Sequence, residues 1–280
     1  MKITVIGLGL IGGSICKAIK KYTNNQVYGY GRNKETLNKA LNCYAIDQIT
    51  DDLSIADMTI VCTPPDNAFS FMQQNANKFK KGSIVADVCG IKGQHAVDTN
   101  SILKSAGVNY VGTHPMAGKE RAGFDNSDAD LFLNANFIVT PLEDTNKEKL
   151  MEVVVLAKEM GFGRIIHATP FDHDKIIAYT SQLAHVVSNA YVKSPTMEIE
   201  LGFSGGSFQD MTRVATVNEY MWTDLFFDNR ECLLNEVTTL IESLKEYQQA
   251  LADNDREKMI SLLRDGRVLK EENLKKHGRL

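Results

Sequence analysis

Short, almost continuously apolar segments alternate with amphipathic helical patterns along the first half of the chain. The apolar segments cover residues 2–6, 26–30, 58–62, 83–88, 109–112 and 137–140. The helical patterns cover residues 11–21, 34–41, 67–79, 93–105 and 147–160. Strands without polar alternation are typical of a parallel sheet that is buried on both faces. The alternation of strand and helix therefore predicts an α/β fold with a doubly wound sheet of the Rossmann type.

The pattern changes after residue 168, where long helical repeats replace the strands. Apolar positions recur at helical spacing over residues 171–192 and 220–251, and a charged helical pattern covers residues 256–275. Thr169-Pro170 marks the change, because proline disfavours helix in the residue before it. We therefore expect a Rossmann domain at residues 1–168 and an all-α domain at residues 169–280. The many apolar helix faces of the second domain predict that it forms a homodimer.

Composition and charge match an ordinary globular protein and exclude several classes of partner. Of the 280 residues, 43% are hydrophobic and 24% charged, with a formal net charge of −4. Because no basic block is present, neither nucleic acid nor a membrane surface is an expected partner.

The apolar start of the chain is interrupted by glycines and followed by lysines, unlike a signal peptide. Five scattered cysteines without a C-x-x-C pair indicate free thiols, and we expect a cytoplasmic protein.

A glycine-rich motif connects the first predicted strand to the first predicted helix. It consists of Gly7, Leu8, Gly9, Leu10, Ile11 and Gly12. In a dinucleotide-binding turn the first glycine permits a tight bend, the second lets the backbone approach a pyrophosphate, and the third lets helix and strand pack closely. Such a motif alone can be a plain turn, but its place after the first strand of a parallel sheet predicts NAD or NADP as cofactor.

The residues after the second predicted strand bear on the choice between these cofactors. NAD-binding chains carry an Asp or Glu there, which accepts hydrogen bonds from the adenosine ribose. This chain has Gly31-Arg32-Asn33 instead. Arg32 can pair with a 2′-phosphate or stack on adenine, although it can equally be an exposed arginine in a turn. Arg32 thus favours NADP, and NAD stays open.

Three further segments follow predicted strands, at the edge where such sheets bind ligands. Thr63 and Pro64 follow one strand, and the segment from Asp87 to Lys92 follows the next, although rigid turns explain both equally well. His114 begins a loop that Pro115 and Gly118 stiffen. A neutral imidazole there can accept a hydroxyl proton while hydride leaves the same carbon, and a purely structural role is about as well supported.

Two groups of polar residues stand out in the helical half. His185 follows Ser181 by one turn and Gln182 by three residues, as in a pocket wall or a hydrogen-bonded core. A second group follows two glycines at a helix start and includes Gly206, Asp210 and Arg213. Arg213 can bind a substrate carboxylate, with Asp210 as its partner, or the two can form a surface ion pair.

The remaining histidines have ordinary explanations. His173 lies between Asp172 and Asp174, but acidic residues there suit the start of a helix. No spacing of His, Cys and carboxylate residues resembles a metal site, so none is expected.

Taken together, these motifs resemble the prephenate dehydrogenase family of tyrosine biosynthesis. The resemblance covers essentially the whole chain, in the family's order, through GLGLIGGS, CTPP, DVCGIK, THPMAGKE, FDHD, SQLAH, GGSFQDMTRVA and Met221-Trp222. THPMAGKE combined with FQDMTRVA is quite specific, because other nicotinamide dehydrogenases of this architecture lack the pair. Two departures are Gly90, where some members have a serine that contacts the catalytic histidine, and Gln182, where some have a histidine.

The resemblance implies oxidative decarboxylation of prephenate to 4-hydroxyphenylpyruvate. It makes His114 the base for the ring C4 hydroxyl, Arg213 the ligand of the ring carboxylate and Asp210 the residue that orients Arg213. It also implies that His185 binds the side-chain carboxylate, and that Glu120 and Trp222 shape the substrate pocket. Because no segment resembles a regulatory domain, any inhibition by tyrosine is expected at the active site itself.

Three alternatives stay open at this point. One is arogenate dehydrogenase, which differs by a single amino or keto contact. Another is a β-hydroxyacid-type dehydrogenase of the same architecture, although such enzymes usually rely on a lysine in the helical domain, where Lys175 is the nearest candidate. The third is a non-catalytic dimer that senses dinucleotides, which would have no need for a base together with an anion clamp.

Overall fold

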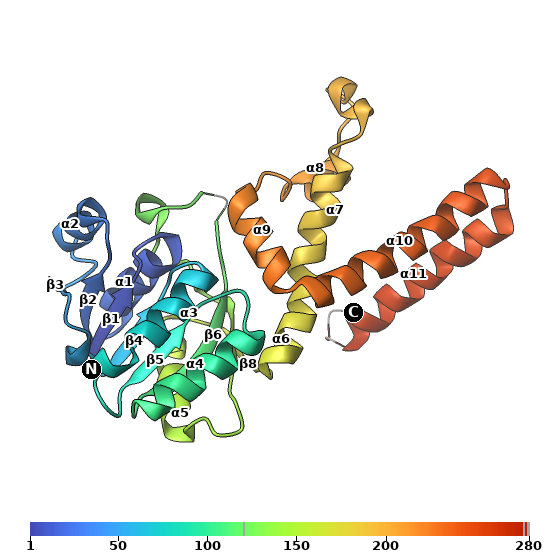
Figure 1. Cartoon of the computed structure of the whole chain (residues 1–280). Coiled ribbons are helices and arrows are strands. Elements are labelled where there is room, and N and C mark those ends of the chain that lie inside the picture. Colours follow the sequence, from blue (N-terminus) through green and yellow to red (C-terminus); the bar gives the residue numbers. More distant parts are fainter. Residues whose placement is uncertain (120, 277, 279–280) are drawn as a thin grey trace. The chain divides into compact units, whose positions relative to one another are not determined.

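A single twisted sheet organises the first half of the protein. The computed structural model describes residues 1–119, 121–276 and 278, and in these it contains an eight-stranded sheet of order β3-β2-β1-β4-β5-β6-β7-β8 (Figure 1). Its strands are β1 (Lys2–Ile6), β2 (Gln26–Tyr30), β3 (Gln48–Ile49), β4 (Met58–Val61), β5 (Ile84–Asp87), β6 (Asn109–Met116), β7 (Asn136–Thr140) and β8 (Arg164–His167). All neighbours are parallel except β6 and β7. The predicted doubly wound α/β fold is confirmed.

Two apolar clusters form the core, one on each face of the sheet. Successive strand residues point to opposite faces, so Ile60 of β4 belongs to one cluster and Val61 to the other. The first cluster receives side chains from α1 (Leu10–Tyr22), α2 (Lys34–Asn42) and α5 (Lys147–Glu159). The second receives them from α3 (Pro65–Gln74) and α4 (Gly93–Ser105). Burial on both faces explains why the central strands have no polar alternation.

Strand β6 is longer than the sequence pattern predicts. The predicted strand ends at Gly112, whereas β6 continues to Met116 by pairing with β7, with His114 opposite Ile138. Beyond Gly112 the strand pairs only with β7, and such a one-sided edge tolerates Pro115, which has no N–H to donate. The expectation that His114 begins a loop is therefore wrong: its backbone is held in a strand. The short edge strands β3 and β8 were also not predicted.

The helical half is more interrupted than its periodicity indicates. The helix predicted over residues 171–192 consists of α6 (Pro170–Ile177), a π-helical turn (Ala178–Gln182) and α7 (Leu183–Tyr191). The pattern over residues 220–251 forms α9 (Glu219–Asp228) and α10 (Arg230–Ala252), and the chain also contains α8 (Gly206–Thr212) and α11 (Arg256–Lys276). The break falls at the buried Asn229, whose amide donates to the Asp174 carbonyl at 2.8 Å.

Contacts divide the chain into two units that are discontinuous in sequence. The first contains Met1–Ile177 and Val217–Asn229, so both α6 and α9 belong with the sheet, and the second contains Ala178–Thr216 and Arg230–Leu280. Within the second unit α10 packs along α11, and the Tyr247 hydroxyl lies 3.4 Å from the Leu262 carbonyl oxygen. The domain boundary at residue 169 stays a prediction. None of the described helices has an apolar stretch long enough to cross a bilayer.

Candidate active site

The glycine turn after β1 has the geometry of a phosphate-binding turn. Gly7 has a φ of +84°, and a Cβ there would lie 2.7 Å from Cγ2 of Thr63. A Cβ at Gly12 would lie 2.1 Å from the Gly7 carbonyl oxygen, so helix and strand touch at this point. At Gly9, by contrast, a Cβ would meet no atom within 4 Å, and no side chain caps α1 there. The first N–H groups of α1 are therefore free of a side-chain cap, as an anion site requires.

The neighbouring residues also fit a dinucleotide. Oγ1 of Thr63 is buried and has no hydrogen-bond partner among the described residues, so a ligand group at this turn would satisfy it. Pro64 caps α3 directly after it. Arg32 is exposed between β2 and α2, while the Asn33 side chain accepts a hydrogen bond from the Thr36 N–H at 3.1 Å and caps α2. Leu8 packs in the core, and Leu10 and Ile11 open α1.

His114 is the first member of a hydrogen-bonded chain that connects β6 to α6. Its Nδ1 lies 2.9 Å from Nε2 of His173, and Nδ1 of His173 lies 2.7 Å from Oδ1 of Asp174. Both His173 and Asp174 are buried, whereas His114 keeps part of its surface exposed. The expectation that His173 serves only an ordinary helix start is therefore wrong, since its ring is the contact between His114 and a carboxylate.

The chain of contacts assigns the proton positions on both rings. Oδ1 of Asp174 also accepts the backbone N–H of Lys92 at 2.9 Å, so it is an acceptor. His173 then donates from Nδ1 to Asp174, which leaves its Nε2 to accept the Nδ1–H of His114. Nε2 of His114 consequently carries a lone pair. A Cβ built on Gly90 would lie 3.8 Å from this atom, so Gly90 provides no side chain to cover it.

Burial keeps His114 uncharged at neutral pH. It lowers the pKa of His114 well below its ordinary value of 6.5, and the charges of His173 and Lys92 lower it further. Burial also lowers the pKa of His173, although its hydrogen bond to Asp174 acts in the opposite direction. A neutral imidazole with a free Nε2 is the form that accepts a proton.

A buried ion pair holds the loop that carries Gly90. Nζ of Lys92 lies 2.5 Å from Oδ1 of Asp87, both side chains are fully buried, and the Tyr110 hydroxyl donates to the other carboxylate oxygen at 2.7 Å. Nζ of Lys92 also donates to the Cys89 carbonyl at 2.6 Å. Burial raises the pKa of the Cys89 thiol well above its usual range, so this thiol is a poor nucleophile.

Helix α9 lies against the same loop. Cδ2 of Leu225 is 3.9 Å from the Cβ position of Gly90. Trp222, one turn earlier on α9, is partly buried and packs against Phe226 with ring centroids 5.5 Å apart. The Cβ position of Gly90 is therefore within 4 Å of both the His114 ring and Leu225, which lies more than 100 positions further along the sequence.

The second unit brings together the other group of predicted site residues. Nδ1 of His185 donates to the Ser181 carbonyl at 2.9 Å, which leaves its Nε2 as an acceptor. Burial lowers the pKa of His185, and the charge of Arg213 lowers it further, so the two residues are close enough to interact. Gln182 is buried in the π-helical turn.

Helix α8 carries the remaining predicted residues of this unit. It begins at Gly206 and contains Asp210, and Arg213 is its C-cap. The pairing of Asp210 with Arg213 stays a prediction. Glu120 lies outside the described residues. Sequence reasoning missed His173, Asp174 and Lys92, whose only signal was an adjacent His-Asp pair and a lysine after a strand.

Comparisons with known proteins show to which family the chain is similar. The family model "Prephenate dehydrogenase, nucleotide-binding domain" matches residues 15–167, and "Prephenate dehydrogenase, dimerization domain" matches residues 169–265. The cyclohexadienyl dehydrogenase of Zymomonas mobilis is 31% identical over 267 residues, covering 90% of this chain and 89% of its own.

Solved structures give the same result. The arogenate dehydrogenase of Synechocystis has a TM-score of 0.83 at 26% identity, over 98% of this chain and 100% of its own. The prephenate dehydrogenase of A. aeolicus, in complex with hydroxyphenyl propionate and NAD+, has a TM-score of 0.85 at 26% identity, over 97% of this chain and 98% of its own.

Proposed function

Because this chain belongs to the prephenate dehydrogenase family and is therefore an NAD(P)-dependent oxidoreductase, we propose that it oxidatively decarboxylates prephenate to 4-hydroxyphenylpyruvate. The product is the precursor of tyrosine in the pathway that gives the family its role. The observation that carries the proposal is the chain of contacts from His114 through His173 to Asp174, which leaves Nε2 of His114 to accept a proton; among the described residues no hydrogen-bond partner of this atom is seen.

His114 is the proton acceptor in this proposal. Its Nε2 accepts the proton of the C4 hydroxyl while hydride leaves C4. When bound, the nicotinamide supplies the acceptor for that hydride. As His114 gains the proton, its Nδ1–H bond to His173 strengthens, because the imidazolium charge is stabilised through His173 by the Asp174 carboxylate. Loss of the C1 carboxylate as CO₂ then makes the ring aromatic, which renders the reaction effectively irreversible.

The second unit supplies the anion-binding side chains in this proposal. Arg213 binds the ring carboxylate bidentately, and Asp210 orients Arg213. His185 and Gln182 bind the side chain of the substrate, with Gly206 at the start of α8 beside it. Glu120 and Trp222 shape the pocket. The interaction of His185 with Arg213 supports this part of the proposal, because it brings two of the predicted substrate-binding residues together in the second unit.

We propose that the glycine turn, Thr63, Pro64 and Arg32 bind the dinucleotide. The open space at Gly9 and the unsatisfied hydroxyl of Thr63 support this part. Arg32, with no acidic residue between β2 and α2, favours NADP, although the A. aeolicus relative was solved with NAD+.

A homodimer through the helical unit completes the proposal. On α10, Leu234, Ile241, Leu244 and Leu251 are exposed and separated by seven, three and seven residues, as on one apolar helix face.

A cytoplasmic location is part of the proposal as well. All five cysteines are free thiols, which suits a reducing compartment.

Three alternatives differ from this proposal in their predicted substrate or activity. Arogenate would use the same base and the same ring carboxylate, so the names of the Zymomonas and Synechocystis relatives keep it as a candidate substrate. A dinucleotide sensor would bind cofactor without turnover. A β-hydroxyacid dehydrogenase would oxidise simple hydroxyacids and depend on a lysine.

The test is a comparison of initial rates with prephenate or arogenate, each with NAD+ or NADP+, together with two variants. We expect turnover of prephenate, more efficiently with NADP+. His114→Asn should bind nucleotide normally but lose about 10²–10⁴-fold in turnover. Arg213→Ala should raise the KM for the cyclic substrate. Near-normal turnover in His114→Asn would exclude the proposed base, and an unchanged KM in Arg213→Ala would exclude the carboxylate role.

A further inference from the structure

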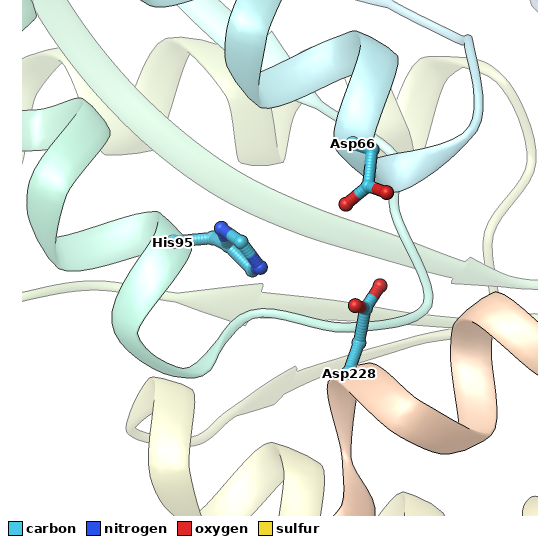
Figure 2. A group of neighbouring side chains, drawn as sticks. All are labelled: Asp66, His95 and Asp228. Atoms are coloured by element: carbon cyan, nitrogen blue, oxygen red, sulfur yellow. The ribbon is translucent and has the colours of Figure 1, made fainter.

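Three potential metal ligands from distant parts of the sequence meet beside the loop that carries Gly90. Asp66 lies in the first turn of α3, His95 in the first turn of α4, and Asp228 at the end of α9. One ligand atom from each lies within 4.8 Å of the other two. Figure 2 shows the two carboxylates pointing toward each other, with the imidazole of His95 directed at the space between them. The proposed dehydrogenase mechanism uses none of the three.

Asp228 is not satisfied by the surrounding protein. Its Oδ2 is buried and has no hydrogen-bond partner among the described residues. A buried acceptor that faces another carboxylate is unfavourable unless a cation or a proton lies between them.

His95 is held in a fixed orientation at the same point. Its ring stacks on the buried ring of Phe69, with centroids 5.0 Å apart and planes 9° from parallel. This contact fixes the plane in which the ring nitrogens lie. Asp66 is exposed, so an ion could reach the cluster from solvent.

We propose that Asp66, His95 and Asp228 bind a divalent transition-metal ion, with Zn²⁺ as the best match. One imidazole nitrogen and two carboxylate oxygens suit Zn²⁺, whereas Ca²⁺ and Mg²⁺ prefer oxygen ligands alone. Ligands about 2.0–2.2 Å from a tetrahedral ion lie about 3.4 Å apart. The side chains therefore need to close by no more than about 1.4 Å, which rotation about their χ angles provides.

Such an ion would fix α9 to the N-terminal ends of α3 and α4. Helix α9 carries Leu225, which packs against Gly90 next to His114. The ion would also replace the repulsion between Asp66 and Asp228 with attraction to a shared cation. The site is proposed on its own geometry and does not depend on the identity of the dehydrogenase substrate.

The experiment measures Zn²⁺ binding directly, with untagged protein that has been treated with a chelator and dialysed. Isothermal titration with ZnCl₂ should give one site per chain, and bound Zn²⁺ should raise the Tm. Asp66→Asn and His95→Gln should each weaken Zn²⁺ binding by at least about tenfold, since even indirect contacts to metal ligands contribute that much. Asp66 is exposed, so its variant should fold normally. Co²⁺ should give a visible absorption band in the wild type that His95→Gln lacks.

The control variant is His167→Gln, which removes an exposed histidine on β8. It should bind Zn²⁺ like the wild type. Mg²⁺ should produce no increase in Tm. The proposal is overturned if the wild type binds no Zn²⁺ at this stoichiometry. It is also overturned if Asp66→Asn and His95→Gln bind Zn²⁺ as tightly as the wild type, which would assign the ion to other groups such as His114 and His173. A third outcome would also overturn the proposal: Zn²⁺ has no effect on the Tm of the wild type, and metal-free Asp66→Asn has a higher Tm than the metal-free wild type. This outcome would indicate a proton shared by the two carboxyl groups.

Discussion

Replacing His173 with phenylalanine tests whether the contact behind His114 contributes to catalysis. The 2.9 Å hydrogen bond between the two rings has Asp174 at its far end, so it becomes charge-assisted when His114 takes up a proton. Hydrogen bonds to charged groups contribute about 1.5–3 kcal/mol. If that contribution exists only in the transition state, His173→Phe should lower kcat by about 10- to 150-fold. Phenylalanine keeps most of the packing between the rings, so the KM for the dinucleotide should not change.

The assay combines steady-state rates, on whichever cyclic substrate the enzyme turns over, with NMR of the imidazole nitrogens. In the wild type, ¹⁵N shifts should show His114 protonated at Nδ1 and bare at Nε2. In His173→Phe the two tautomers should mix. His173→Gln should recover part of kcat, because its amide oxygen can accept the Nδ1–H. His167→Phe, an equivalent change on the exposed surface of β8, should have no effect.

Two results would refute this reasoning. One is a kcat for His173→Phe within about twofold of the wild type, which is less than the weakest charge-assisted hydrogen bond would produce. The other is a wild-type His114 that carries its proton on Nε2. Either result would reduce His173 to a packing residue.

Three further predictions concern the same region. Because burial lowers the pKa of His114, this base stays neutral to below pH 6.5. In a pH profile of kcat/KM, the loss of activity on the acid side should therefore begin below pH 6.5. A loss of activity that begins above pH 6.5 would contradict the assignment of His114 as the base. Gly90→Ser should fold normally and keep activity, because its Cβ would lie 3.7–3.9 Å from the nearest atoms of His114 and Leu225. Urea unfolding and the kcat of the variant check this. A decrease in the free energy of unfolding by more than about 1 kcal/mol would show that the loop does not accept a side chain. Lys92→Met should lower the free energy of unfolding by about 3–5 kcal/mol, because it leaves Asp87 buried and unpaired. Lys104→Met, which breaks an exposed ion pair, should cost less than about 1 kcal/mol in the same urea titration, and equal losses in the two variants would refute the argument.

The local sequence is sufficient to predict much of the nucleotide-binding half. The bounds of β1, β2 and α4 agree with the predicted ones, because continuous apolar runs and turn residues act over a few positions. The glycine turn is equally local: the close approach at Gly12 and the positive φ of Gly7 follow from a strand that turns directly into a helix. The motif residues around His114 and Arg213 were likewise recognisable from their order along the chain.

What the sequence by itself determined was therefore the α/β alternation, the phosphate-binding turn and the identity of the candidate base. Only the tertiary structure decided that β6 extends through His114, because that extension requires pairing with β7. It also decided that His173 contacts His114, and that Asp66, His95 and Asp228 meet. The physical reason is that periodicity and turn chemistry report neighbours a few residues apart. Contacts between distant segments depend on strand register and helix packing, which arise only when the whole sheet forms.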